Sequence, residues 1–210
     1  MVPLFRVYPR QDNRAMNRLT TLLGTDLPLI QAPMAGVQGA ALAVAVCNAG
    51  GLGSLPCAQL TLEALPRELQ ALAAGTSRPF NVNFFCHTPP TPDAAREAGW
   101  RAALKPFYDE IGLDPATVPA GAGRMPFSLA AADVLAPFKP RVVSFHFGLP
   151  DAAAIARVKA WGSVVISSAT TADEARWLVA HGADAVIAQG LEAGGHRGHF
   201  LSDDLTRQSG

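Results

Sequence analysis

The sequence predicts an α/β protein built around a parallel sheet. Six short apolar runs alternate with longer stretches that follow a helical pattern. The runs lack the apolar–polar alternation of a half-exposed strand, so both faces of each strand are expected to be covered. Most runs begin about twenty residues apart, which suits a strand, a loop and a helix in turn. Six such units fit either a doubly wound sheet or part of an eight-stranded barrel.

The order of the elements follows from these runs. Strands are expected at 28–34, 50–55, 79–85, 141–148, 163–169 and 183–190. Helices are expected between them, at 39–49, 61–75, 151–162 and 171–183. For the last two helices, Asp151 and either Thr171 or Asp173 supply N-cap oxygens, and Gly162 and Gly182 follow as stops.

The helix near residues 173–181 has an amphipathic pattern. Its core face is predicted to carry Ala175, Leu178 and Val179. Its outward face is predicted to carry Asp173, Glu174 and Arg176.

Two segments fall outside the repeating pattern. Residues 1–15 are expected to be a disordered N-terminal extension, which leaves 16–210 as one domain. Residues 86–140 are rich in proline and carry helical pieces, which predicts an elaborated insertion over the mouth of the fold. A lid or substrate wall and a surface insertion without direct function both fit this segment.

Composition narrows the class of partner. The 210 residues include 17 basic and 17 acidic side chains, and this zero net charge argues against nucleic acid and favours a small molecule. The three cysteines lie in apolar sequence without a CxxC pair, which indicates reduced, buried thiols in a cytoplasmic protein. The most apolar run is interrupted by Asn48 and paired glycines, so no membrane span is expected.

Polar or unusual residues recur where the predicted strands end. In an α/β sheet, ligands meet the carboxyl ends of the strands, so this pattern is the main physical indication of a small-molecule site. The residues concerned are Gln31, Met34, Asn83, His146, Ser167, Ser168 and Gln189.

Amides and glycines at these strand ends have two interpretations. Asn83 and Gln189 can hydrogen-bond the polar edge of a flat heterocycle, or they can satisfy neighbouring backbone groups. The glycines of "NAGGLGSL" (48–55) can bring backbone N–H groups close to an anion, or they can pack a tight turn against the sheet. The spacing does not match a dinucleotide fingerprint.

His196 is the best candidate for chemistry among the five histidines. It follows paired glycines in "QGLEAGGHRGH", directly after an apolar strand, and its imidazole can accept a proton near neutral pH. His146 lies between two phenylalanines and faces either the mouth of the fold or the core. His87 and His181 are interpreted as structural, with His181 placed to complement a helix C-terminus. No metal-ligand pattern occurs, which leaves an organic cofactor as the chemical agent.

Five motifs in the same order resemble the nitronate monooxygenases, formerly called 2-nitropropane dioxygenases. The resemblance runs from about Leu19 to the C-terminus, and three of the motifs are similar to the class I branch, which favours propionate 3-nitronate. The motifs are "LPLIQAPMAG", "NAGGLGSL", "FNVNFFCHTPP", "VVSFHFGLP" and "AVIAQGLEAGGHRGHFL".

The resemblance implies a TIM-type (β/α)8 barrel that binds FMN and no metal, and that oxidises alkyl nitronates with O2 to a carbonyl compound and nitrite. It implies His196 as the catalytic base. It implies His146 as a substrate-binding residue, whose protonated imidazole would balance the nitronate charge. It further implies FMN contacts at Pro33, Met34, Asn83, Gln189 and Gly194. Assembly as a homo-oligomer is left open.

One departure from the family pattern concerns the C-terminus. The family's later strands, with the glycine-rich turns that hold the FMN phosphate, have no counterpart after residue 198, so C-terminal truncation is expected. Two alternatives to the monooxygenase therefore stay open. The first is an NADH-dependent flavin reductase of the same barrel superfamily, and the second is a catalytically inactive truncated fragment.

Overall fold

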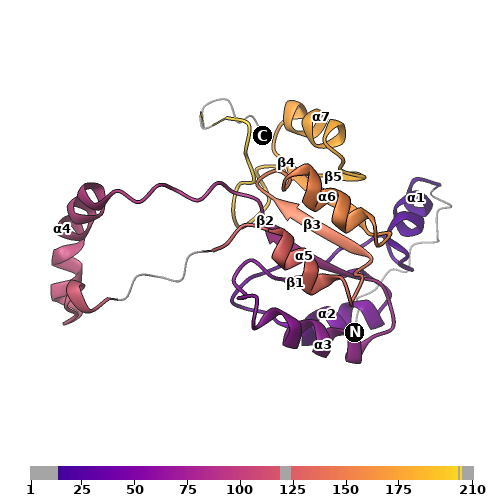
Figure 1. Ribbon diagram of the computed structural model, residues 1–210, viewed down its shortest axis with the longest axis horizontal. Helices are drawn as coiled ribbons and strands as arrows, with labels where there is room; N and C mark the ends of the chain where they lie inside the picture. The colour runs from indigo at the N-terminus through magenta and orange to yellow at the C-terminus, as the bar shows by residue number, and fades with distance from the viewer. Residues whose placement is uncertain (1–13, 119–123, 203, 205–210) are drawn as a thin grey trace, which may run out of the picture.

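A five-stranded parallel sheet forms the centre of the computed structural model, which describes residues 14–118, 124–202 and 204 (Figure 1). The strands lie across the sheet in chain order, and all four neighbouring pairs are parallel. The predicted sheet type is thus confirmed. The strands are β1 (Gly53–Pro56), β2 (Phe80–Phe85), β3 (Val142–His146), β4 (Val164–Ala169) and β5 (Ala185–Ala188).

Helices cover the outer face of this sheet. Alternate strand residues such as Leu55, Val82 and Phe145 enter one large core together with buried side chains of the covering helices. A right-handed strand–helix–strand crossover buries such a face against its own helix, which explains why these alternate residues are apolar. The covering helices are α2 (Ala40–Asn48), α3 (Leu65–Gly75), α5 (Leu129–Leu135), α6 (Ala152–Lys159) and α7 (Ala172–Ala180).

Helix α1 (Arg14–Leu23) lies at the amino ends of the strands. Leu23 is fully buried in a second core with Leu52 and Val142, and the Arg141 guanidinium donates to the Leu22 carbonyl at 2.7 Å. This packing occupies the end of the sheet opposite the strands' carboxyl edge. Residues 1–13 of the predicted extension lie outside the described residues.

The first predicted strand, at 28–34, is reduced to a single bridge between Ile30 and Leu52. The ladder begins in the expected way, because the Leu52 amide donates to the Leu29 carbonyl at 2.8 Å and the Gln31 amide donates to the Leu52 carbonyl at 2.9 Å. Prolines at both ends of the run remove backbone donors. Six apolar runs therefore give five strands and one bridge in the described part of the chain.

The predicted helix ends are confirmed at α6 and α7. The Asp151 carboxylate accepts the Ala154 amide at 2.7 Å, and the Thr171 hydroxyl accepts the Glu174 amide at 3.1 Å. Of the two N-cap candidates for α7, Thr171 is the one used. Gly162 and Gly182 follow the two helices with φ of +82° and +107°, a region that favours glycine.

The predicted orientation of α7 is wrong at two positions. Leu178 is buried as expected, but Val179 is 62% exposed. Glu174, predicted to face outward, is only 2% exposed. Its carboxylate is covered because backbone and hydroxyl donors from two separate segments converge on it.

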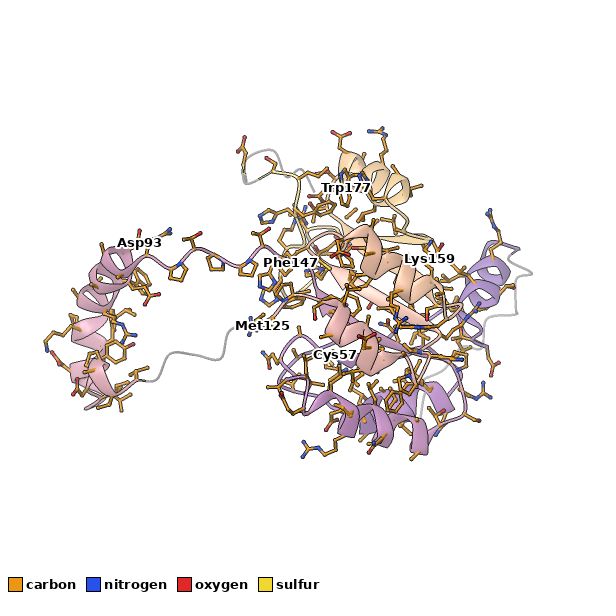
Figure 2. All side chains as sticks on the ribbon, viewed as in Figure 1. Cys57, Asp93, Met125, Phe147, Lys159 and Trp177 are labelled. Carbon is orange, nitrogen blue, oxygen red and sulfur yellow. The ribbon has the colours of Figure 1, made fainter. Side chains whose placement is uncertain are left out.

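The segment expected as an elaborated insertion contains helix α4 (Ala94–Glu110), a short 3-10 helix η1 (Pro115–Thr117) and α5. Only α5 packs in the helical layer, whereas α4 has no buried residue and stands clear of the sheet in Figure 1. Figure 2 marks the two connections to α4 with Asp93 and Met125. A lid or wall role for this segment stays a prediction. None of the helices in the described ranges is long and apolar enough to cross a membrane.

Candidate active site

The carboxyl edge of the sheet brings together several of the predicted site residues. Phe85 at the end of β2 pairs in register with His146 at the end of β3. Ser168 lies near the end of β4, and Gln189 continues β5 by donating its amide to the Ala169 carbonyl at 2.9 Å. Because parallel strands end at one edge, these side chains surround a common region, as the sequence predicted.

The segment after Gln189, here called the glycine loop (residues 190–201), folds back over this edge. Both polar atoms of the Gln189 side chain bind this loop. Nε2 donates to the His196 carbonyl at 2.8 Å, and Oε1 accepts the Gly198 amide at 2.7 Å. Gly195 has a φ of +80°, which a residue with a side chain rarely adopts. Gln189 thus performs the backbone role that the sequence left open, and its contact with FMN stays a prediction.

His146 uses both ring nitrogens inside the protein. Nε2 lies 3.1 Å from the His196 carbonyl oxygen, and Nδ1 contacts the Ser168 hydroxyl. A carbonyl oxygen only accepts, so Nε2 carries a proton, and in the neutral ring Nδ1 then accepts from the Ser168 hydroxyl. His146 therefore links β3 and β4 to the backbone of the glycine loop.

The electrostatics of His146 follow from this position. Burial lowers the pKa of the imidazole, and the nearby His196 ring acts in the same direction, while the hydrogen bond to the His196 carbonyl opposes both. The lowered pKa favours the neutral ring, in which Nε2 is a hydrogen-bond donor. That a protonated His146 balances the charge of a nitronate stays a prediction, as does its role in binding substrate.

Five aromatic rings gather around the end of β3, here called the aromatic cluster (Phe85, His87, His146, Phe147 and His196). Phe147, labelled in Figure 2, has a φ of +66°, an uncommon conformation for a bulky residue that costs about 1–2 kcal/mol. Its ring centroid lies 4.4 Å from that of His146 and 5.9 Å from that of His196. Such strain at a strand end is typical of a functional site.

His196 has a fixed backbone and an accessible side chain. Its carbonyl oxygen receives donors from Gln189 and His146, whereas the residue as a whole is exposed. The ring meets Phe85 edge-on, with centroids 5.5 Å apart. This arrangement suits a group that must reach a ligand from an anchored position, as expected for a base.

His87 is a member of the cluster that the sequence interpretation treated as structural. Its ring lies 6.2 Å from Phe85 and 6.3 Å from Phe147, and its Nδ1 is buried without a hydrogen-bond partner in the described structure. The available signal was position, because His87 follows β2 by two residues at the same edge as His146.

A second polar group lies on the inner face of the sheet. The Asn83 side-chain amide donates to the Ser144 hydroxyl at 2.9 Å, and the Asn81 amide donates to the hydroxyls of Ser54 and Ser144. Asn81 is 1% exposed, and its Oδ1 has no hydrogen-bond partner among the described residues. Asn83 was predicted from the sequence and Asn81 was not, although the period of two in "FNVNFF" places both on one face.

The remaining residues predicted to contact FMN do not interact with the aromatic cluster in the described ranges. Met34 is 44% exposed just beyond the Ile30 bridge, and Pro33 is half-buried beside it. Gly194 is exposed on the glycine loop, and a Cβ there would meet nothing within 4 Å. Within the described ranges no hydrogen bond or ring contact joins Pro33, Met34 or Asn83 to His146 or His196.

These features define the general class of the protein. A parallel α/β sheet with chain-order strands and a polar, histidine-bearing carboxyl edge is the arrangement of α/β enzymes that bind small molecules at that edge. The described residues contain no group of three or more metal-ligating side chains that could hold a metal ion.

Comparison with known proteins identifies the family within that class. The sequence profile of the family described as nitronate monooxygenase matches residues 16–209, so the chain belongs to the nitronate monooxygenase family. This is a family of flavin-dependent enzymes. The resemblance predicted from five motifs is thereby confirmed at the level of the family.

Curated relatives agree with this assignment. A nitronate monooxygenase of Paraburkholderia phytofirmans is 47% identical over 196 residues, which is 91% of this chain and 53% of the relative. One from Pseudomonas aeruginosa is 47% identical over 191 residues, covering 88% of this chain and 53% of the relative. The chain thus spans about half the length of the curated relatives it matches.

Solved structures show the same relation. A nitroalkane oxidase from Streptomyces ansochromogenes superposes with a TM-score of 0.75 at 41% identity, over 89% of this chain and 52% of that one. FabK from Thermotoga maritima superposes with a TM-score of 0.61 at 27% identity, over 87% of this chain and 47% of that one. The chain shares its fold with about half of each of these TIM-barrel enzymes.

Proposed function

We propose that this chain carries the histidine-bearing part of an FMN-dependent nitronate monooxygenase site. The reaction would be oxidation of an alkyl nitronate of the propionate 3-nitronate class by O2, giving a carbonyl compound and nitrite. One observation carries the proposal: Gln189 and His146 both hydrogen-bond the His196 carbonyl, which holds an exposed imidazole at the carboxyl edge of a sheet of this family.

FMN would supply the electron-accepting centre of the reaction, and the chain's own residues would hold and orient it. The site offers features that fit a flat heterocycle. Gly194 leaves open space on the glycine loop, so a ring can approach its backbone. On the inner face of the sheet, the unpartnered Asn81 Oδ1 leaves a buried acceptor one strand period from Asn83. Pro33, Met34, Asn83, Gln189 and Gly194 are the residues that we propose hold the cofactor.

His196 would act as the base for substrates that arrive as neutral nitroalkanes. Such a substrate must lose an α-proton to become the nitronate, and an exposed imidazole accepts a proton readily near neutral pH. A preformed nitronate has already lost that proton. His196 is therefore needed for one substrate form and not for the other.

His146 would contribute position and a neutral donor. Its Nε2 proton and the Gln189 amide converge on one carbonyl oxygen, which fixes the backbone that carries the base. Phe147 and Phe85 pack against the imidazoles and would limit the access of water to part of the site. Exclusion of water strengthens the electrostatic interactions formed there.

The primary test is cofactor binding by the purified chain. The absorbance spectrum and the quenching of flavin fluorescence are recorded with and without added FMN. Saturable binding, followed by oxygen uptake and nitrite release on addition of propionate 3-nitronate, supports the proposal. Absence of binding at any FMN concentration refutes it for this chain and favours the catalytically inactive fragment.

Substitutions at two histidines distinguish the role of His196 as a base from a general loss of activity. In the FMN-loaded chain, His196→Asn is expected to lower activity on neutral nitroalkanes by about a hundredfold while sparing preformed nitronates. The matched control is His181→Asn, because His181 stacks on Trp177 at the end of α7 and lies outside the site. Equal losses on the two substrate forms would contradict a role as base.

The same preparation tests the alternative reductase. Rapid bleaching of bound flavin by NADH under anaerobic conditions would favour an NADH-dependent flavin reductase. Bleaching by nitronate and not by NADH favours the monooxygenase. We further propose a cytoplasmic location, which the three unpaired cysteines in the described part of the chain support.

A further inference from the structure

The buried carboxylate of Glu174 lies outside the candidate active site and makes an unusual set of contacts. It is 2% exposed in the first turn of α7, although its sequence context predicts a solvent-facing position. Oε2 accepts the Thr170 amide at 2.7 Å and the Thr170 hydroxyl at 2.8 Å. A buried carboxylate is tolerated only when hydrogen bonds replace its lost water.

The other carboxylate oxygen binds the far end of the glycine loop. Oε1 accepts the Phe200 amide at 2.8 Å and the Leu201 amide at 3.4 Å. Glu174 therefore joins the turn after β4 to the end of the glycine loop. Burial raises the pKa of this carboxyl, but the hydrogen bonds from Thr170, Phe200 and Leu201 outweigh burial and lower it, so the group is ionised at neutral pH.

The Phe200 side chain completes this attachment. Its ring packs against Trp177 of α7 at 5.2 Å, edge to face. A Cβ at Gly148 would lie 3.2 Å from the Phe200 ring, so the ring also closely approaches the strained turn after His146. The end of the glycine loop is thus fixed against both α7 and the turn at Gly148, which follows Phe147 of the aromatic cluster.

The glycine loop is anchored at both ends, and His196 lies between the anchors. At its start, Gln189 extends β5 in the sheet ladder. At its end, Glu174 holds Phe200 and Leu201. Since the intervening residues include Gly194, Gly195 and Gly198, the loop has little stiffness of its own. Loss of one anchor would let the His196 carbonyl leave His146 and Gln189.

We propose that Glu174 is a positioning residue for His196. It accepts hydrogen bonds from the Phe200 and Leu201 amides and so keeps the glycine loop folded over the carboxyl edge. This inference rests on the proposed function, since it assigns a role to the placement of His196. Glu174 would thus contribute to the active site without contacting substrate or cofactor.

The test is hydrogen exchange of the full chain, which needs neither flavin nor turnover. In Glu174→Gln, whose side chain has the same shape without the charge, the Phe200 and Leu201 amides are expected to exchange about tenfold to a hundredfold faster. The Val143 and Val165 amides in β3 and β4 are expected to keep their rates. Because no cofactor is present, failure of FMN to bind leaves this result intact.

The matched control is Asp173→Asn, which removes a negative charge from the adjacent position of the same helix turn. Asp173 is exposed and pairs only with the exposed Arg176 in the described contacts. If Glu174 acted merely as a negative charge at the helix N-terminus, Asp173→Asn and Glu174→Gln would have similar effects. We expect Asp173→Asn to leave the Phe200 and Leu201 amides unchanged, and equal effects would overturn the proposal.

A second readout separates positioning from general stability. In Glu174→Gln the pKa of His146, followed by NMR of its imidazole, is expected to rise, because the loop that buries the ring moves away. Glu174→Asp, which keeps the charge on a shorter side chain, is expected to restore part of the exchange protection. Unchanged loop exchange in Glu174→Gln, or an equal increase at Val143 and Val165, would overturn the proposal. If that variant fails to fold, Thr170→Val serves instead, with a severalfold increase at Phe200 expected and an unchanged rate overturning it.

Discussion

Gly198 provides the sharpest single test of the packing between the glycine loop and His146. A Cβ placed on Gly198 would lie 2.5 Å from His146 Cε1, 2.9 Å from His146 Nδ1 and 3.1 Å from the Ser168 hydroxyl. The imidazole cannot easily yield, because its two nitrogens are bound to Ser168 and to the His196 carbonyl. Gly198→Ala should therefore force either the loop or the ring to move.

The magnitude follows from two opposing contributions. Overpacking a tight site costs about 1–3 kcal/mol. Replacing glycine restricts the unfolded chain and offsets about 0.4–1 kcal/mol of that cost. We expect a net loss of about 1–2 kcal/mol in the free energy of unfolding. For a chain of this length, the corresponding fall in Tm is about 2–8 °C.

Gly194→Ala is the matched control on the same loop. A Cβ at Gly194 meets nothing within 4 Å, and neither Gly194 nor Gly198 has the positive φ that would penalise alanine. We expect Gly194→Ala to be neutral or more stable by up to about 1 kcal/mol. In the FMN titration, however, Gly194→Ala should weaken binding if that backbone lies against the cofactor.

Urea unfolding followed by circular dichroism measures the free-energy difference, and NMR of the His146 ring reports the local change. Gly198→Ala is expected to be less stable than Gly194→Ala and to shift the His146 signals. If the two variants unfold at the same urea concentration and the His146 signals stay in place, the loop does not pack on His146 as described.

Three further measurements test the wider structure. Because Glu174 has a lowered pKa in the folded state, its stabilising contribution is present above the ordinary carboxyl pKa and is lost as pH falls through the lowered value. The free energy of unfolding in urea should therefore fall between about pH 6 and pH 3, and Glu174→Gln should lack this pH dependence. Burial raises the pKa of Cys47, Cys57 and Cys86, so at about pH 8 all three thiols should resist alkylation until the chain unfolds, and rapid labelling of the folded protein would contradict this. Thr171→Ala removes the N-cap of α7 and should cost about 1 kcal/mol in urea unfolding.

Local rules predicted most of the fold. Four of the five strands lie inside predicted apolar runs, and β1 extends one residue beyond its run at 50–55. The ends of α6 and α7 follow from Asp151, Thr171, Gly162 and Gly182. Each of these features depends on residues close together in the chain, where periodicity and capping are informative. The run at 28–34 does not form a full strand because strand pairing requires neighbours as well as apolar residues, and within the described residues Ile30 bridges only to Leu52.

The site was predicted unevenly for the same reason. The positions of Gln189, His146 and His196 at the carboxyl edge could be predicted because each ends a strand or follows one, while their functional roles stay predictions. Glu174 was predicted to face solvent because it is charged, although it lies four residues before the buried Leu178 and so shares its face of the helix. The backbone donors that allow a carboxylate to be buried there come in part from Phe200, 26 residues further along the chain, and no local pattern encodes them.

The hydrogen bonds that position His196 are made by the main chain of the glycine loop and not by the His196 side chain. Gln189, His146 and Glu174 all act on the loop's main chain: the first two bind the His196 carbonyl, and the third binds the Phe200 and Leu201 amides. Main-chain anchors do not depend on the identity of the side chain at 196. It follows that His196→Asn should leave the loop in place and remove only its chemistry. Changes at Glu174 or Gly198 should instead displace an unaltered imidazole, so the two kinds of variant distinguish a missing base from a misplaced one.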